Sequence, residues 1–160
     1  AVLNRNGYDA ELLNGDLPSA AKKQQFTHDI THHTMLHEQL HTLFRGFRRD
    51  AHPMAVMCGV VGALAAFYHD SLDIFDPHHR LVTSHRLIAK MPTLAAFAYR
   101  HTRGLPYVYP DNDLQYSGNF LGMMYKMTEL KYQPDPRLER ALDTDTVAVL
   151  DRLSEAVRQA

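Results

Sequence analysis

The sequence has little of several features that would assign it to a special class of protein. Its one cysteine, Cys58, excludes a disulfide within the chain and indicates a reducing compartment. The net charge of −1 leaves no strongly basic surface for nucleic acid or an anionic membrane. The first residues lack the apolar core of a signal peptide, and the longest apolar run, residues 55–68, is too short to span a membrane. These absences predict a soluble cytoplasmic protein with no nucleic-acid or membrane partner.

What is present is a succession of segments with apolar residues at the helical period, separated by short breaks rich in Pro, Gly and Asp. Strand alternation is missing. The pattern predicts one all-α domain over residues 1–160, in which 144–160 form an amphipathic tail. The expected helices are 19–30 with Ser19 as N-cap, 33–47, 53–68, 78–101 and 114–124.

Two of these helices carry unusual residues. The segment 53–68 starts with Pro53, is apolar on nearly all sides and contains Gly59 and Gly62. Glycine destabilises a helix interior, so we expect another helix backbone to approach closely there. Cys58 is predicted to be a small core residue of this helix. In the segment 78–101, Pro92 removes one hydrogen-bond donor and is expected to kink the helix.

A metal site is one interpretation of the run His37-Glu38-Gln39-Leu40-His41, which matches the H-E-x-x-H pattern of zinc hydrolases. On a helix the two histidines share a face and can reach one zinc ion, while Glu38 polarises its water. The pattern is short, however, and a chain with 11 histidines matches it easily by chance. Arg45 and Gly46 follow where a third ligand would be needed. We therefore predict no metal site and keep a zinc hydrolase as a distant alternative.

Four blocks in fixed order carry a resemblance to a known family. The blocks are Thr31–Leu40, Phe47–Asp73, Arg86–Thr93 and Tyr107–Pro110. They resemble bacterial citrate synthase, in particular the hexameric type of Gram-negative bacteria, and the similarity extends over residues 14–143. The resemblance implies the helical large-domain core of that enzyme, which condenses acetyl-CoA with oxaloacetate at the entry to the tricarboxylic acid cycle. It also implies that the helices 53–68 and 78–101 lie in a sandwich between subunits. The expected partner is a second copy of the chain or a full-length citrate synthase.

The family's catalytic segments are not found among these 160 residues. The resemblance calls for a His in a segment similar to H-A-D-H-E-Q-N, a second His beside a G-G-A-N-like turn, and a later Asp. After Asp143 the chain continues as Thr144-Asp145-Thr146-Val147 instead, so no catalytic residue is assigned. We expect a truncated large-domain fragment that is inactive on its own. The alternative is a catalytically dead paralogue that acts as an oligomerisation or regulatory subunit.

One binding site of the family does fall within the chain. Gram-negative members bind NADH as an allosteric inhibitor, and the matching positions here are His33, Met35, Tyr68, Arg86, Lys90 and Asn112. Arg86 and Lys90, four residues apart, can present two cations to a diphosphate, and Tyr68 can stack on the adenine. His32 and Asp111 stand where such enzymes usually carry Arg, which weakens the match. No cofactor is required by this interpretation, and NADH is expected at most as a regulatory ligand. The alternative is an ordinary solvated face of the helix.

Overall fold

The computed structural model describes residues 19–143, and all regular structure in that range is helical. In chain order the elements are α3 (Ala20–His32), α4 (Gln39–Gly46), α5 (Pro53–Phe67), the 3-10 helix η1 (His69–Ser71), α6 (Pro77–Arg103) and α7 (Tyr116–Tyr125). Residues 136–143 form one more helical stretch. The predicted all-α class is confirmed, whereas the tail 144–160 lies outside the described residues.

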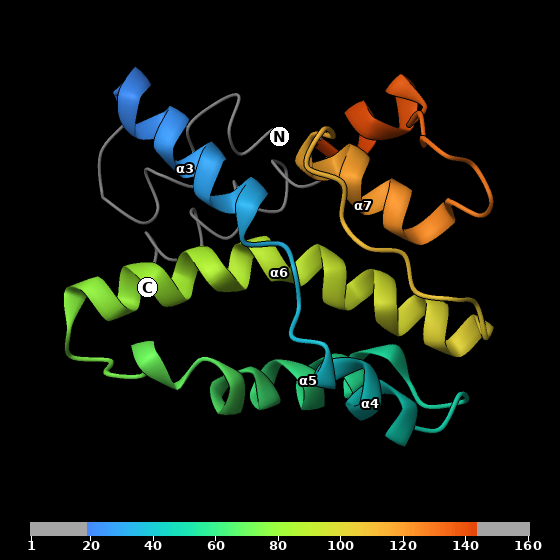
Figure 1. Ribbon diagram of the computed structural model, residues 1–160, viewed down its shortest axis with the longest axis horizontal. Coiled ribbons are helices and arrows are strands. Elements are labelled where there is room, and N and C mark those ends of the chain that lie inside the picture. Colours follow the sequence, from blue (N-terminus) through green and yellow to red (C-terminus); the bar gives the residue numbers. More distant parts are fainter. Residues whose placement is uncertain (1–18, 144–160) are drawn as a thin grey trace, which may run out of the picture.

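Helix α6 runs through the middle of the molecule, with α3 and α7 on one side of it and α4 and α5 on the other (Figure 1). The larger hydrophobic cluster joins α4, α5 and α6, and its members include Leu40, Phe44, Val56, Val60, Leu94 and Phe97. A smaller cluster joins Phe26 and Ile30 of α3 to Ala89 of α6. No helix in the described part of the chain has both the length and the apolarity needed to cross a membrane.

Local capping signals set several of the helix ends. The Ser19 hydroxyl accepts from the backbone N–H of Lys22 at 3.4 Å, as its predicted N-cap role requires. At the start of α6, the Asp76 carboxylate accepts from the N–H of His78 at 2.7 Å. The same helix ends at Gly104, whose φ of 68° lies in the left-handed region that favours glycine.

The predicted helix 33–47 is wrong in its first part, because α4 begins only at Gln39. The side chains of α6 explain the difference. Lys90 Nζ donates to the carbonyls of His33 and Met35, each at 2.6 Å, and Thr93 Oγ1 donates to the carbonyl of Thr34 at 2.9 Å. These carbonyls therefore receive donors without forming a helical turn, and the segment 34–37 stays non-helical between α3 and α4.

Helix α5 buries one face and exposes the other. Val56, Val60 and Leu64 are spaced by four residues and lie in the core. Cys58 is exposed, so its predicted place in the core is wrong; it lies on the opposite face of the helix. A Cβ added to Gly62 would meet nothing within 4 Å in the described structure, whereas one added to Gly59 would lie 3.1 Å from the ring of Phe47.

Helix α6 continues through Pro92 without interruption. Because proline has no N–H, the carbonyl of Ile88 one turn earlier loses its helical donor. The hydroxyl of Tyr116, the first residue of α7, donates to that carbonyl at 2.9 Å. The position at which the sequence predicts a kink in α6 is thus a contact point between α6 and α7.

Candidate functional site

The residues predicted for a nucleotide site come together where α5, η1 and α6 meet. Arg86 and Lys90 lie four residues apart on α6, and Tyr68 follows the last residue of α5. The Arg86 guanidinium carbon lies 5.2 Å from the centre of the Tyr68 ring, and Lys90 Nζ lies 4.9 Å from it. Both distances fall within the range of cation–π attraction. The two cations that the sequence assigns to a diphosphate therefore lie next to the ring that it assigns to the adenine.

Lys90 connects this cluster to the segment between α3 and α4. Its side chain is buried, and its ammonium group donates to the carbonyls of His33 and Met35. Burial, helped by the nearby charge of Arg86, lowers the pKa of Lys90 to about 8. An ammonium group has three donors, and two are used by these carbonyls. His33 and Met35 are thus near the cluster through their backbone carbonyls.

Arg86 is held by a bidentate ion pair. Its two terminal nitrogens donate to the two carboxylate oxygens of Asp70 at 2.7 and 3.0 Å, and Nη1 also donates to Ser71 Oγ at 2.9 Å. The hydrogen bond between the two side chains raises the pKa of Arg86 and lowers that of Asp70. The ion pair occupies both terminal nitrogens of the guanidinium, which a phosphate would otherwise contact.

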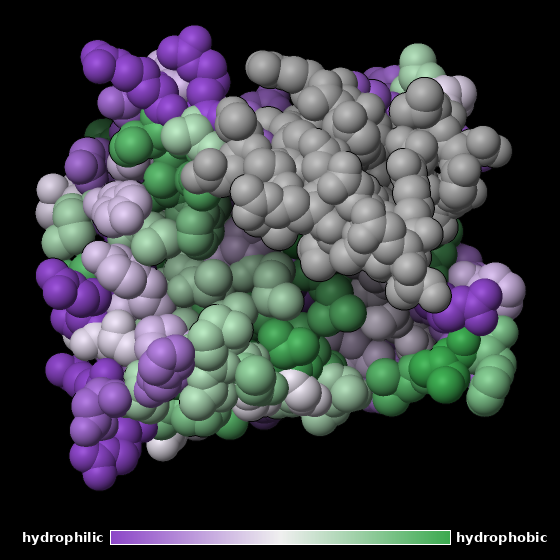
Figure 2. Space-filling view, turned by 180° about the vertical axis from the view of Figure 1, so that it is seen from behind, coloured by the Kyte–Doolittle hydropathy of each residue, from purple (hydrophilic) through white to green (hydrophobic). Residues whose placement is uncertain are grey.

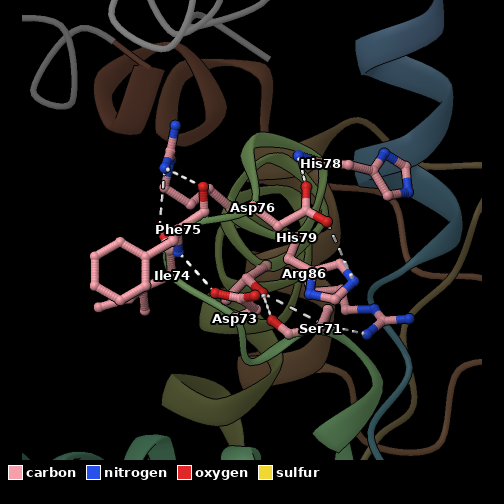
Figure 3. A network of polar contacts seen from close by, with 10 residues as sticks. Ser71, Asp73, Ile74, Phe75, Asp76, His78, His79 and Arg86 are labelled. Atoms are coloured by element: carbon pink, nitrogen blue, oxygen red, sulfur yellow. Dashed lines mark hydrogen bonds and ion pairs between the residues drawn. The ribbon is translucent and has the colours of Figure 1, made fainter.

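The loop before α6 supports this ion pair with a polar network that Figure 3 shows from close by. The carboxylate of Asp73 accepts from the N–H of Phe75 at 2.9 Å, and Arg80 Nη1 donates to the carbonyl of Ile74 at 2.9 Å. Thr83 Oγ1 donates to the carbonyl of Ser71 at 2.7 Å. The loop is therefore anchored to α6 by both side chains and backbone, and this keeps η1 next to Arg86.

A cavity of about 200 Å³ opens beside the cluster. Its walls are mainly apolar and include Val61, Leu64 and Leu87, with Tyr68, Arg86 and Lys90 among the polar members. Sites for small molecules usually measure about 300–1,000 Å³. The cavity as it stands has room for a ring but not for a complete dinucleotide, so the diphosphate would have to lie outside it, along the cations.

The structure does not bring all six predicted residues together. Asn112 is exposed in the segment between α6 and α7, and none of the contacts among residues 19–143 joins it to Tyr68, Arg86 or Lys90. Its neighbour Asp111 accepts from the N–H of Asp113 at 3.0 Å, so this turn is stabilised locally.

Sequence reasoning missed two residues of the cluster, Asp70 and Ser71. They lie 16 and 15 residues before Arg86 and on a different element, so helical spacing does not predict that they contact it. The available signal was the run His69-Asp70-Ser71 directly after an apolar helix, which places an acidic side chain at a helix end. The sequence does not show which cation pairs with Asp70, because the path of the loop decides which side chain lies next to its carboxylate.

The H-E-x-x-H run does not form the helical pair that a zinc site requires. His37 precedes α4, and its Nδ1 accepts from the N–H of Gln39 at 3.2 Å, as a capping group does. His41 lies within α4 and is buried among aromatic rings. In the ranges that the structure describes, no group of three or more His, Cys, Asp or Glu side chains is arranged to hold a metal ion.

Comparisons with known proteins agree with this architecture. The sequence profile described as citrate synthase, C-terminal domain, matches residues 8–152. The crystal structure of citrate synthase from Pyrobaculum aerophilum superposes with a TM-score of 0.74 at 28% identity, over 88% of this chain and 37% of that one. Citrate synthase from Thermotoga maritima MSB8 gives a TM-score of 0.63 at 19% identity, over 84% of this chain and 32% of that one, and supports the fold. The chain spans about a third of the length of these structures, and it belongs to the citrate synthase family.

Proposed function

We propose that this chain supplies the helical large-domain core of a citrate synthase of the hexameric, Gram-negative type, acting in the cytoplasm. The reaction of the assembled enzyme is the condensation of acetyl-CoA with oxaloacetate. The observation that carries the proposal is the family match over residues 8–152, which covers every described helix. Because residues 1–160 contain no segment similar to the family's catalytic histidine motifs, these residues do not catalyse the condensation by themselves.

The exposed face of α5 supports assembly through this helix. None of its residues is charged, and apart from the exposed Met54 near the start of the helix they are small: Ala55, Cys58, Gly59, Gly62, Ala65 and Ala66. Figure 2 shows hydrophobic side chains along the lower part of the rear face, the edge along which α5 runs in Figure 1. A helix face of small residues allows another backbone to approach closely, and burial of apolar surface stabilises the contact. A second copy of the chain, or a full-length citrate synthase, fits this face.

The mass of the purified chain in solution, measured by light scattering, tests the assembly. We expect a defined oligomer, alone or after mixing with a full-length bacterial citrate synthase, and Gly62→Leu is expected to abolish it. Gly46→Leu is the matched control, because a Cβ at Gly46 also meets nothing within 4 Å and Gly46 lies on α4. The assembly is contradicted if the chain is a monomer that does not bind the synthase. It is also contradicted if the two substitutions change the measured mass equally. A mixed oligomer without activity of its own favours the regulatory-subunit alternative.

Catalysis is tested separately by the release of free CoA from acetyl-CoA in the presence of oxaloacetate. The chain alone is expected to give no rate above the uncatalysed background. Measurable turnover by the pure chain would overturn the scaffold proposal, because it would require catalytic groups that the sequence does not show.

NADH is the proposed regulatory ligand, at the cluster formed by Tyr68, Arg86 and Lys90. The two cations above one aromatic ring support the proposal, and the Asp70 carboxylate on Arg86 opposes it until it is displaced. NADH fluorescence on titration with protein tests the binding. Arg86→Ala is expected to weaken it about tenfold, since one charge-assisted hydrogen bond contributes about that factor. Arg103→Ala, an exposed arginine at the other end of α6, is the control for lost charge.

A further inference from the structure

A second and larger cavity lies at the other end of the molecule, between α4, the end of α6 and the segment 104–109. It measures about 730 Å³, and we refer to it as the His41 cavity. The residues that line this cavity include Glu38, His41, Arg45, Arg49, Tyr107 and Tyr109. Its size falls within the range of sites for small molecules, which is about 300–1,000 Å³. None of the residues of the Arg86 cluster lines it.

Two arginines of the cavity lack a carboxylate partner. Among residues 19–143, neither Arg45 nor Arg49 forms an ion pair, whereas Arg48 forms a bidentate pair with Asp50 at 2.7 and 2.8 Å. Arg49 instead lies over the backbone of Gly104, where a Cβ would come within 2.9 Å of its Nη1. Glycine at this position therefore leaves room for the guanidinium at the edge of the cavity.

Aromatic rings form one wall of the cavity. The His41 ring stacks on Tyr109 with centroids 5.6 Å apart, and the edge contact with Tyr107 has centroids 4.9 Å apart. Phe97 stacks behind Tyr107 at 4.6 Å. His41 Nε2 is buried and has no hydrogen-bond partner among the described residues, which is costly for a polar atom. The wall thus offers the flat surface of aromatic rings to a ligand.

The remaining polar groups are already oriented. His101 Nε2 faces the carbonyl of Phe47 at 3.0 Å, so this nitrogen carries the proton, and Nδ1 then accepts from the Tyr107 hydroxyl at 3.4 Å. The Tyr109 hydroxyl donates to the exposed carboxylate of Glu38 at 3.1 Å. Two unpaired guanidiniums against one carboxylate leave the cavity with an excess of positive charge.

We propose that the His41 cavity binds a phosphate monoester carried on a planar ring. The phosphate lies between Arg45 and Arg49, because guanidinium groups match the oxygen geometry and the double charge of a phosphate. The ring lies against the aromatic wall of Tyr107 and Tyr109. This site is separate from the proposed NADH site and does not depend on the proposed function of the chain.

Calorimetric titration with phenyl phosphate tests the site directly. We expect a dissociation constant below about 1 mM, with inorganic phosphate and phenol each binding about tenfold more weakly, because each lacks one of the two contacts. Equal affinity for phenyl phosphate and inorganic phosphate would overturn the role of the aromatic wall. No heat change with phenyl phosphate up to 10 mM, about ten times the expected constant, would overturn the site itself.

Three variants locate the binding. Arg49→Gln is expected to weaken phenyl phosphate binding about tenfold, whereas Arg48→Gln removes the same charge outside the cavity and is expected to change nothing. Arg86→Ala leaves binding unchanged if the ligand occupies the His41 cavity. Equal losses in Arg48→Gln and Arg49→Gln, or a loss in Arg86→Ala, would overturn the assignment. Arg48 and Arg49 are exposed, and circular dichroism of the variants checks that the helices are retained.

Discussion

The two halves of α6 use their cations in opposite ways. In the N-terminal half, Arg86 lies near the surface and pairs with the exposed carboxylate of Asp70. In the C-terminal half, Arg100 is fully buried and meets backbone carbonyls instead. Its Nε donates to Met123 at 2.5 Å and its Nη1 to Pro106 at 2.7 Å, while Nη2 donates to Lys126. Arg86 thus pairs with one exposed side chain, whereas Arg100 supplies the donors for three backbone carbonyls.

The difference separates a cation that holds parts of the fold together from a cation that is paired at the surface. Carbonyls of three separate positions converge on Arg100, so this side chain ties the end of α7 and the turn after α6 to the helix. Lys90 is intermediate, because it is buried and also lies over Tyr68. Position along α6 therefore changes the role of a cation from a surface ion pair to a structural connection.

The largest expected effect is that of Arg100→Met. Methionine fills much of the volume but leaves one buried and two partly buried carbonyls without their donors, so we expect a loss of about 3–5 kcal/mol in the free energy of unfolding. Urea denaturation followed by circular dichroism measures it. Arg103→Met, on the exposed end of the same helix, is the control and is expected to change stability by less than about 0.5 kcal/mol. Similar midpoints for the two variants would show that Arg100 is not a structural connection.

Lys90→Met is expected to have the next largest effect, about 1–3 kcal/mol at pH 7, because the carbonyls of His33 and Met35 lose their donor. The effect also depends on pH. The folded pKa of about 8 lies below the unfolded value of 10.5, so the unfolded chain holds more protons between these values. The contribution of Lys90 to stability is therefore complete above pH 10.5 and declines as the pH falls to 8. The wild type should gain stability over Lys90→Met between pH 8 and 10.5. A difference in stability that stays constant over this range contradicts the buried ammonium.

Capping residues predicted much of this fold from the sequence, and long-range contacts decided the rest. Ser19 and Pro53 mark helix starts that the structure confirms, and the helix expected from residue 78 begins one residue earlier, at Pro77. The error at residues 33–38 has a specific cause: the donors that satisfy their carbonyls come from Lys90 and Thr93, more than 50 residues further along the chain. Helical periodicity contains no information about donors from another element.

The candidate site divides in the same way. The spacing of Arg86 and Lys90 on one helix was readable, because positions four residues apart share a face. The ion pair with Asp70 was not, since it depends on the path of the loop through η1. The cations of the His41 cavity were also missed. The sequence does not show that Arg48 pairs with Asp50 while the neighbouring Arg49 lies against Gly104.

Asp70→Asn sharpens the comparison at the surface end of α6, and its interpretation rests on the proposed NADH site. Removing the carboxylate that holds Arg86 frees the guanidinium for a diphosphate, so NADH affinity is expected to rise about tenfold. Fluorescence titration measures the change. Asp113→Asn, an exposed carboxylate paired with Lys131, is the control for the general loss of negative charge. Weaker binding in Asp70→Asn would mean that the ion pair positions Arg86 for the ligand rather than competing with it.

The smallest expected effect belongs to the middle of α6, where Pro92 separates the two halves. Tyr116→Phe removes the donor to the Ile88 carbonyl and should cost about 1 kcal/mol in the free energy of unfolding. Tyr125→Phe, at a half-exposed tyrosine of the same helix, is the control. Pro92→Ala restores a backbone N–H that can reach the Ile88 carbonyl, so the cost of Tyr116→Phe should fall in that background. An equal cost with and without Pro92 would show that the tyrosine stabilises α7 through its other contacts, and that the missing N–H of the proline is not the reason for its hydroxyl.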